Sequence, residues 1–218
     1  MNCIAILGWG SLLWDPDPEF DKWHHEWLFD GPVPKIEFSR VSATRARALT
    51  LVLDIRNGRE CTVAYALSRR RTLDDAIADL RCREGTTIAN IGVFSAEGSR
   101  LRSGSAESLD GLKSWMSVRK MDHVVWTDLK SNFEQESHGR KPFSVDAGIA
   151  HIQSLDAGGK ARAAEYVWRA PAFVQTPLRD ALQTQLWFAR PTERNTPAKD
   201  KSCQPLASVP NPVSDSGA

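Results

Sequence analysis

The order of the apolar segments constrains the fold of this chain most strongly. Short apolar runs typical of buried strands come first, and helical patterns dominate the end of the chain. Between the third and fourth runs, Asn57-Gly58 is a strong signal for a hairpin turn. The predicted strands cover residues 2–7, 35–42, 49–53, 61–67, 88–94 and 123–126.

The first predicted helix covers residues 72–83. Thr72 can cap it and Asp75 follows three residues later, as in a capping box. Gly85 is suited to a left-handed cap at its end. Further helical patterns cover residues 145–155, 158–169 and 177–188. Strands followed by helices, with a hairpin among the strands, predict an α+β fold rather than a doubly wound sheet.

A change in composition sets the expected domain boundary. Residues 1–190 have the apolar content of one folded domain, whereas Pro, Ser, Thr, Asn and Lys dominate residues 191–218. Such a segment buries too little apolar surface to offset the entropy of ordering. We therefore expect one domain followed by a flexible tail.

Charge and composition exclude several function classes. The formal net charge of +1 gives no electrostatic argument for nucleic acid. No stretch approaches the ~20 apolar residues that a membrane helix needs, and the N-terminus lacks a secretory signal pattern. The four cysteines form neither a CxxC pair nor a zinc spacing. We expect a cytoplasmic protein that binds neither nucleic acid nor a membrane, while its oligomeric state stays open.

Two short motifs could carry chemistry. Gly8-Trp9-Gly10-Ser11-Leu12 follows the first strand directly, where main-chain N–H groups can approach a ligand. Arg83-Glu84-Gly85 ends the first predicted helix. Each motif alone has an ordinary explanation, because glycine turns follow strands in many folds and a helix-end Glu is usually solvated.

Together the two motifs resemble a known family. Gly8-Trp9-Gly10-Ser11-Leu12, followed by Trp14, resembles the Gly-Tyr-Gly-Ser-Leu signature of the γ-glutamylcyclotransferases, and is closest to their glutathione-specific branch. Arg83-Glu84-Gly85 resembles the segment that supplies the family's catalytic carboxylate. Residues 38–40, 51–53 and 63–65 are similar to intervening strands of that branch. The resemblance covers residues 3–95 well and 120–185 loosely, with Trp9 where the family usually has Tyr.

The resemblance implies a mostly antiparallel, barrel-like sheet with flanking helices. It also implies a reaction without metal or cofactor, in which the α-amine of a γ-glutamyl compound attacks its own γ-carbonyl. The products are 5-oxoproline and a released amine. Glu84 would be the general acid/base, and we expect partial burial to raise its pKa, because an ordinary Glu near pKa ~4.3 is a weak base.

The remaining predicted site residues bind the substrate. Gly8, Trp9, Gly10, Ser11 and Leu12 form the turn, whose main-chain N–H groups can meet the substrate carboxylate or a developing oxyanion. By analogy with late tyrosines in the family, Tyr166 is a further candidate pocket residue, although its sequence context favours a position in the helix core. We expect the Arg83 side chain to point away from Glu84, because pairing would lower the pKa of the carboxyl group.

Several alternatives stay open. The substrate would be glutathione or another γ-glutamyl peptide, or else a γ-glutamylamine or another amide cleaved on the same scaffold. A different class is a non-catalytic protein that binds a small ligand in the same pocket. Ser11 is a poor covalent nucleophile, since the glycine that follows serine in a nucleophile elbow is missing. His24-His25-Glu26 is a weak metal motif, because adjacent residues rarely converge on one ion.

Overall fold

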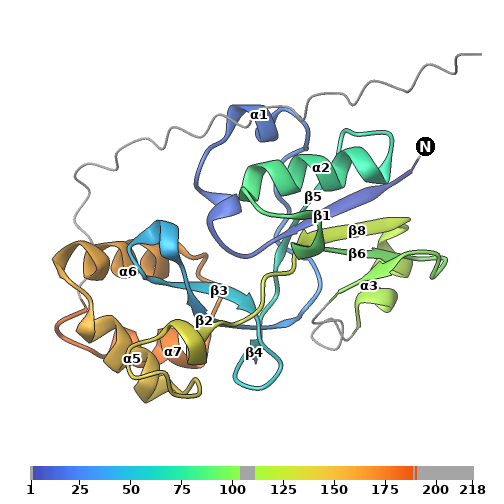
Figure 1. Ribbon diagram of the computed structural model, residues 1–218. Helices are drawn as coiled ribbons and strands as arrows, with labels where there is room; N and C mark the ends of the chain where they lie inside the picture. Colours follow the sequence, from blue (N-terminus) through green and yellow to red (C-terminus); the bar gives the residue numbers. More distant parts are fainter. Residues whose placement is uncertain (1, 104–110, 189, 191–218) are drawn as a thin grey trace, which may run out of the picture.

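The computed structural model describes residues 2–103, 111–188 and 190, which form two β-sheets with flanking helices (Figure 1). The five-stranded sheet has the order β5-β1-β8-β6-β7, and the three-stranded sheet has the order β3-β2-β4. The strands are β1 (Ile4–Gly8), β2 (Lys35–Val41), β3 (Leu49–Leu53), β4 (Arg59–Glu60), β5 (Ala64–Leu67), β6 (Ile91–Ser95), β7 (Leu101–Arg102) and β8 (His123–Thr127). The helices are α1 (Pro18–Asp21), α2 (Leu73–Glu84), α3 (Leu112–Arg119), α4 (Phe133–Glu136), α5 (Val145–Ser154), α6 (Ala157–Arg169) and α7 (Pro177–Gln183), with short 3₁₀ turns η1 (Ser11–Leu13), η2 (Ala43–Arg45) and η3 (Ile88–Asn90).

Strand β1 is central because both of its faces are buried. Ile4 and Ile6 join a cluster with Leu80 of α2. Ala5 and Leu7, which point to the opposite face, belong to a second and larger core. A strand that is buried on both faces has a continuous apolar sequence, which is why β1 could be predicted from the sequence.

The larger core lies between one face of the five-stranded sheet, the three-stranded sheet and the C-terminal helices. Leu7 of β1 and Phe38 of β2 meet Val167 of α6 and Leu178 of α7 in this core. Figure 1 shows α2 over the five-stranded sheet, while α5, α6 and α7 surround β2 and β3. The end of β1 therefore comes close to the three-stranded sheet, where the candidate site lies.

The α+β prediction is confirmed, but the barrel-like sheet is wrong: the described strands form two sheets and no closed barrel. All their pairings are antiparallel except β1 with β8. The sheets meet where residues 28–34 run beside residues 61–65. There the carbonyls of Pro32 and Pro34 accept hydrogen bonds from the N–H groups of Val63 (3.0 Å) and Cys61 (3.1 Å). Because proline has no N–H to donate, no continuous ladder joins the sheets.

The predicted hairpin at Asn57-Gly58 is also wrong. The turn forms, with the Gly58 N–H donating to the Asp54 carbonyl at 2.8 Å. However, the chain leaves it as β4, which pairs with β2 on the side opposite β3, and β5 pairs with β1. The Asp54 carboxyl group accepts from the N–H of Asn57 at 3.0 Å and widens the turn. A Cβ at position 58 would lie 2.4 Å from the Asp54 carbonyl oxygen, so the turn requires a glycine at this position.

The predicted helices are confirmed with small changes at their ends. Thr72 caps α2 by accepting from the Asp75 N–H at 3.2 Å, and Gly85 ends the helix with φ of 58°. Helix α7 stops at Gln183, before the expected residue 188. None of the described helices combines the length and apolar character needed to cross a membrane. The predicted tail, residues 191–218, lies outside the described residues.

Candidate functional site

A cavity of about 140 Å³ opens beside the end of β1, the end of α2 and the loop between β2 and β3. One water molecule needs only about 10–15 Å³, so the cavity has room for a small organic group. All the site residues predicted from the sequence line it: Gly8, Trp9, Gly10, Ser11, Leu12, Glu84 and Tyr166. The fold thus brings together two motifs and a late tyrosine that are far apart in the sequence.

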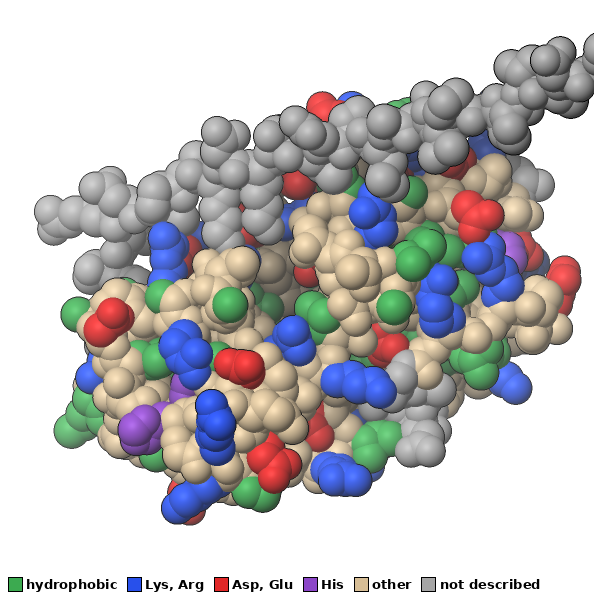
Figure 2. All heavy atoms as spheres, in the orientation of Figure 1, with side chains coloured by type: hydrophobic (Ala, Val, Ile, Leu, Met, Phe, Trp, Pro, Cys, Tyr) green, Lys and Arg blue, Asp and Glu red, His purple; other side chains and the backbone are tan. Residues whose placement is uncertain are grey.

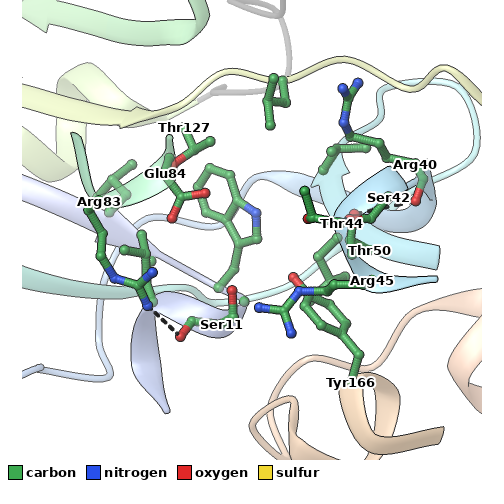
Figure 3. A pocket seen from close by; sticks show the side chains of 18 residues that line it. Ser11, Arg40, Ser42, Thr44, Arg45, Thr50, Arg83, Glu84, Thr127 and Tyr166 are labelled. Carbon is green, nitrogen blue, oxygen red and sulfur yellow. Dashed lines mark hydrogen bonds between the residues drawn. The ribbon is translucent and has the colours of Figure 1, made fainter. Parts of the chain in front are cut away.

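Glu84 is the last residue of α2 and is half-buried. The left-handed Gly85 turns the chain away directly after it, which leaves the Glu84 side chain at the helix end. Figure 3 shows the Glu84 carboxyl group pointing into the cavity, close to Thr127 from the end of β8. The Thr127 hydroxyl is buried and has no hydrogen-bond partner among the described atoms, so it can bond to a ligand.

Arg83 fixes the end of α2 against the glycine turn. Its guanidinium group donates to the Asp15 carbonyl at 2.5 Å and to the Ser11 carbonyl at 3.4 Å. Figure 3 shows this side chain running toward Ser11, whereas Glu84 projects into the cavity. The expected direction of the Arg83 side chain is therefore confirmed. Because Arg83 is buried, these bonds hold the two motifs in one arrangement.

Gly10 is required by the close approach of Tyr166. A Cβ at position 10 would lie 2.5 Å from the Tyr166 hydroxyl oxygen, well inside van der Waals contact. Tyr166 is 5% exposed, and its ring makes an edge contact with Trp14 at 5.4 Å between ring centroids. The sequence left open whether Tyr166 is a pocket residue or a helix core residue, and it is both.

The Tyr166 hydroxyl lies among polar groups, yet it stays protonated. Burial raises the pKa of Tyr166 to about 12, and the charge of Glu84 acts in the same direction. The charge of Arg45 and hydrogen bonds from the backbone of Ser11 and Leu51 oppose this rise in the pKa. At neutral pH the phenol is therefore neutral and can donate its proton in a hydrogen bond into the cavity.

Further polar groups come from β2, β3 and the loop that joins them. Arg40, Ser42, Thr44, Arg45 and Thr50 all line the cavity. Sequence reasoning did not assign a role to any of them, because no periodic pattern or motif distinguishes a polar side chain at a strand end. The only available signal was the similarity of residues 38–40 to a strand of the γ-glutamylcyclotransferases.

The two arginines of this loop region are held differently. Arg45 pairs with Asp15 at 3.0 Å, and its guanidinium carbon lies 5.1 Å from the centre of the Tyr166 ring. Arg40 donates to the Lys130 carbonyl at 2.6 Å, and burial lowers the pKa of its side chain. Arginine carries a positive charge, so both side chains bring positive charge to the cavity.

His24, His25 and Glu26 do not form a metal site. His24 bonds through Nδ1 to the His25 carbonyl at 2.6 Å and packs against Phe20 and Trp27. Within residues 2–103, 111–188 and 190, no group of three or more His, Cys, Asp or Glu side chains could hold a metal ion.

The cavity therefore places a carboxyl group, a neutral phenol and guanidinium groups around one small space. Charges of both signs are mixed over the face of the molecule seen in Figure 2, so no broad patch of one sign covers that face. Searches of family models, curated proteins and solved structures find no match to this chain.

Proposed function

We propose that the protein is a cytoplasmic enzyme of the γ-glutamylcyclotransferase kind, which converts the γ-glutamyl group of a small peptide or amide into 5-oxoproline. One observation carries the proposal: Glu84 and the turn of Gly10 and Ser11 line a single cavity, together with Tyr166. A motif gains weight when its structural context matches the chemistry that it is meant to serve.

In the proposed reaction the substrate supplies its own nucleophile. Glu84 accepts a proton from the α-ammonium group, and the resulting amine attacks the γ-carbonyl carbon to form a five-membered ring. The bond between that carbon and the leaving nitrogen then breaks. The α-nitrogen gives up two protons in total and the leaving nitrogen gains both, so the amine departs as an ammonium ion and no water is consumed.

Tyr166 and the glycine turn would stabilise the oxyanion that forms when the γ-carbonyl is attacked. The neutral Tyr166 hydroxyl has a proton to donate to this oxyanion. The N–H group of Leu12, in the glycine turn, would be a second donor. Fixed donors of this kind contribute about 3 kcal/mol each where water is excluded.

The experiment is to incubate the purified protein with glutathione, a γ-glutamyl amino acid and a γ-glutamylamine, and to quantify 5-oxoproline, released amine and free glutamate. Cyclisation predicts equal amounts of 5-oxoproline and amine from at least one substrate, without glutamate. Release of glutamate would instead indicate hydrolysis by water. If the compounds bind but no product forms, the protein is a binding module and the enzymatic proposal is wrong.

A further inference from the structure

Arg45 is the cationic group that faces Glu84 across the cavity. Figure 3 shows its guanidinium group projecting into the space between Ser11 and Tyr166, while the Glu84 carboxyl group enters from the other side. The charges of both side chains act on the same Tyr166 hydroxyl, with opposite effects on its pKa. Arg45 and Glu84 thus act on one hydroxyl from two sides of the cavity.

The loop that carries Arg45 is closed tightly on itself. The Ser42 N–H donates to the Ala48 carbonyl at 3.0 Å, and the Arg47 N–H donates to the Ser42 carbonyl at 2.9 Å. Ala46 and Arg47 have positive φ of 49° and 63°, a conformation that non-glycine residues adopt only when their surroundings enforce it.

Contacts with two helices hold this loop in place. The Arg47 carbonyl lies 2.9 Å from Nε2 of His151 in α5. The Ala46 carbonyl oxygen packs so closely against Gly159 of α6 that a Cβ there would lie 2.8 Å from it. Arg45 is thus presented by a segment that is fixed on both sides of it, as expected for a binding residue rather than a solvated arginine.

The Arg45 guanidinium group is held in one orientation and has further N–H donors that can bind a ligand. Its pair with Asp15 uses Nη2, and its central carbon lies 5.1 Å from the centre of the Tyr166 ring. The Arg45 side chain is only 15% exposed. Arginine carries five N–H donors in a planar fork, a geometry that matches a carboxylate. Arg40, by contrast, is engaged with the Lys130 carbonyl.

We propose that Arg45 binds the α-carboxylate of the γ-glutamyl group, so that Arg45 and Glu84 together recognise the α-amino-acid head of the substrate; the inference rests on the proposed function. An α-amino acid carries its ammonium and carboxylate groups on one carbon atom, and therefore needs partners of opposite charge on two sides of a narrow space. This cavity provides them in Glu84 and Arg45.

The assignment also accounts for the backbone donors of the glycine turn. With the substrate carboxylate on Arg45, the main-chain N–H groups of the glycine turn can serve the oxyanion that forms when the γ-carbonyl is attacked. With the α-carboxylate on Arg45 and the α-nitrogen on Glu84, only the short side chain of the glutamyl group remains free to rotate. Two fixed points of this kind favour ring closure through orientation.

The test compares two substrates that differ only in the α-carboxylate: a γ-glutamyl anilide and the matching γ-aminobutyryl anilide, which cyclises to 2-pyrrolidinone. Wild-type protein is expected to prefer the γ-glutamyl compound in kcat/KM by about 100-fold, the usual size for a desolvated charge pair. Arg45→Met should reduce this preference to about 5-fold or less, chiefly by slowing the γ-glutamyl substrate. A preference unchanged in Arg45→Met would overturn the inference while leaving the cyclisation reaction intact.

Two variants separate recognition from folding. Arg47→Met removes an arginine from the same loop that pairs with Glu136 and does not line the cavity, so it should keep the wild-type preference. Arg45→Lys keeps the charge but loses the planar fork, so the preference should fall between those of the wild type and Arg45→Met. Thermal unfolding of each variant verifies that the protein is folded.

A binding measurement distinguishes failure of this inference from failure of the proposed reaction. Ligand-observed NMR titrations with 5-oxoproline and 2-pyrrolidinone require no turnover. Tighter binding of 5-oxoproline by wild type, lost in Arg45→Met, supports the carboxylate site even if no γ-glutamyl compound is cyclised. If wild type bound the two lactams equally well, the proposal that Arg45 binds the carboxylate would be wrong.

Discussion

Gly10 and Tyr166 act as a pair at the scale of single residues. The missing side chain of Gly10 provides the space that the Tyr166 hydroxyl occupies. The glycine turn therefore positions a phenol in addition to exposing its own amides. This coupling predicts that the two residues depend on each other in a way that a double-mutant cycle can measure.

Gly10→Ala should lower kcat about 100-fold, because the new Cβ displaces the Tyr166 hydroxyl from the place where it donates. Tyr166→Phe should cost a similar factor. In the Tyr166→Phe background, Gly10→Ala should lower kcat further by only about 3-fold or less. The reason is that the next nearest atom, Cζ of the ring, would be 3.5 Å from the new Cβ. Steady-state kinetics of the four proteins test this, and independent, multiplying effects would refute the coupling.

The sequence could predict the residues of the two motifs but not their partners. Glu84 and Gly10 stand in recognisable local contexts, a capped helix end and a glycine turn after a strand. Arg45 and Thr127 reach the cavity only because the tertiary fold brings a loop and a strand end to it. No local pattern encodes such a contact, since it depends on how β2, β3 and β8 are placed relative to α2.

At the scale of elements, a buried carboxyl group links β2 to helix α7. Glu37 of β2 is fully buried, and its Oε2 accepts from the N–H of Leu178 in the first turn of α7 at 3.2 Å. Its Oε1 accepts from the N–H of Phe38 at 2.7 Å. An acceptor at a helix start satisfies one of the backbone donors that lack a partner there. Burial raises the pKa of Glu37 to about 7, although these hydrogen bonds oppose the rise.

The raised pKa of Glu37 predicts a stability that falls as the pH increases. Its contribution is fully present below the pKa of the unfolded chain, near 4.3, and is lost as the pH rises through about 7. Between pH 5 and 8 the free energy of unfolding of wild type should therefore fall, relative to that of Glu37→Gln, by about 2.5 kcal/mol.

Urea unfolding of both proteins at several pH values measures this difference. Glu60→Gln, at an exposed position in the neighbouring strand β4, is the matched control and should follow the wild type at every pH. If the difference in the free energy of unfolding between wild type and Glu37→Gln stayed constant from pH 5 to 8, Glu37 would not titrate in this range.

Elements with local signals were predictable, and pairings between elements were not. Thr72 and Gly85 mark the ends of α2 through their own chemistry, and the structure confirms both. Asn57-Gly58 indicated a turn correctly, but the partner of the following strand depends on the position of β2, which lies between β3 and β4. Similarly, the two prolines that separate the sheets lie in a connection and carried no strand signal of their own.

At the scale of the whole molecule, the cavity exists because two sheets meet without merging. The glycine turn extends from the five-stranded sheet, Arg45 belongs to the loop of the three-stranded sheet, and Tyr166 comes from the helix that packs on β3. Arg83 ties α2 to the turn, and Asp15 ties the turn to Arg45. This arrangement does not require a closed barrel. The predicted site residues therefore line one cavity although the described strands do not form the predicted barrel-like sheet.

The account depends most on Glu84 as the group that moves protons during ring closure. The direct measurement is the rate of 5-oxoproline release from a γ-glutamyl substrate by wild type, by Glu84→Gln and by the control Glu134→Gln, which alters an exposed carboxyl group in α4. We predict that Glu84→Gln loses at least about 100-fold in kcat with an unchanged melting temperature, because a general acid/base contributes 10²–10⁴-fold, and that Glu134→Gln retains the wild-type rate. Release of 5-oxoproline by Glu84→Gln at the wild-type rate would contradict the account.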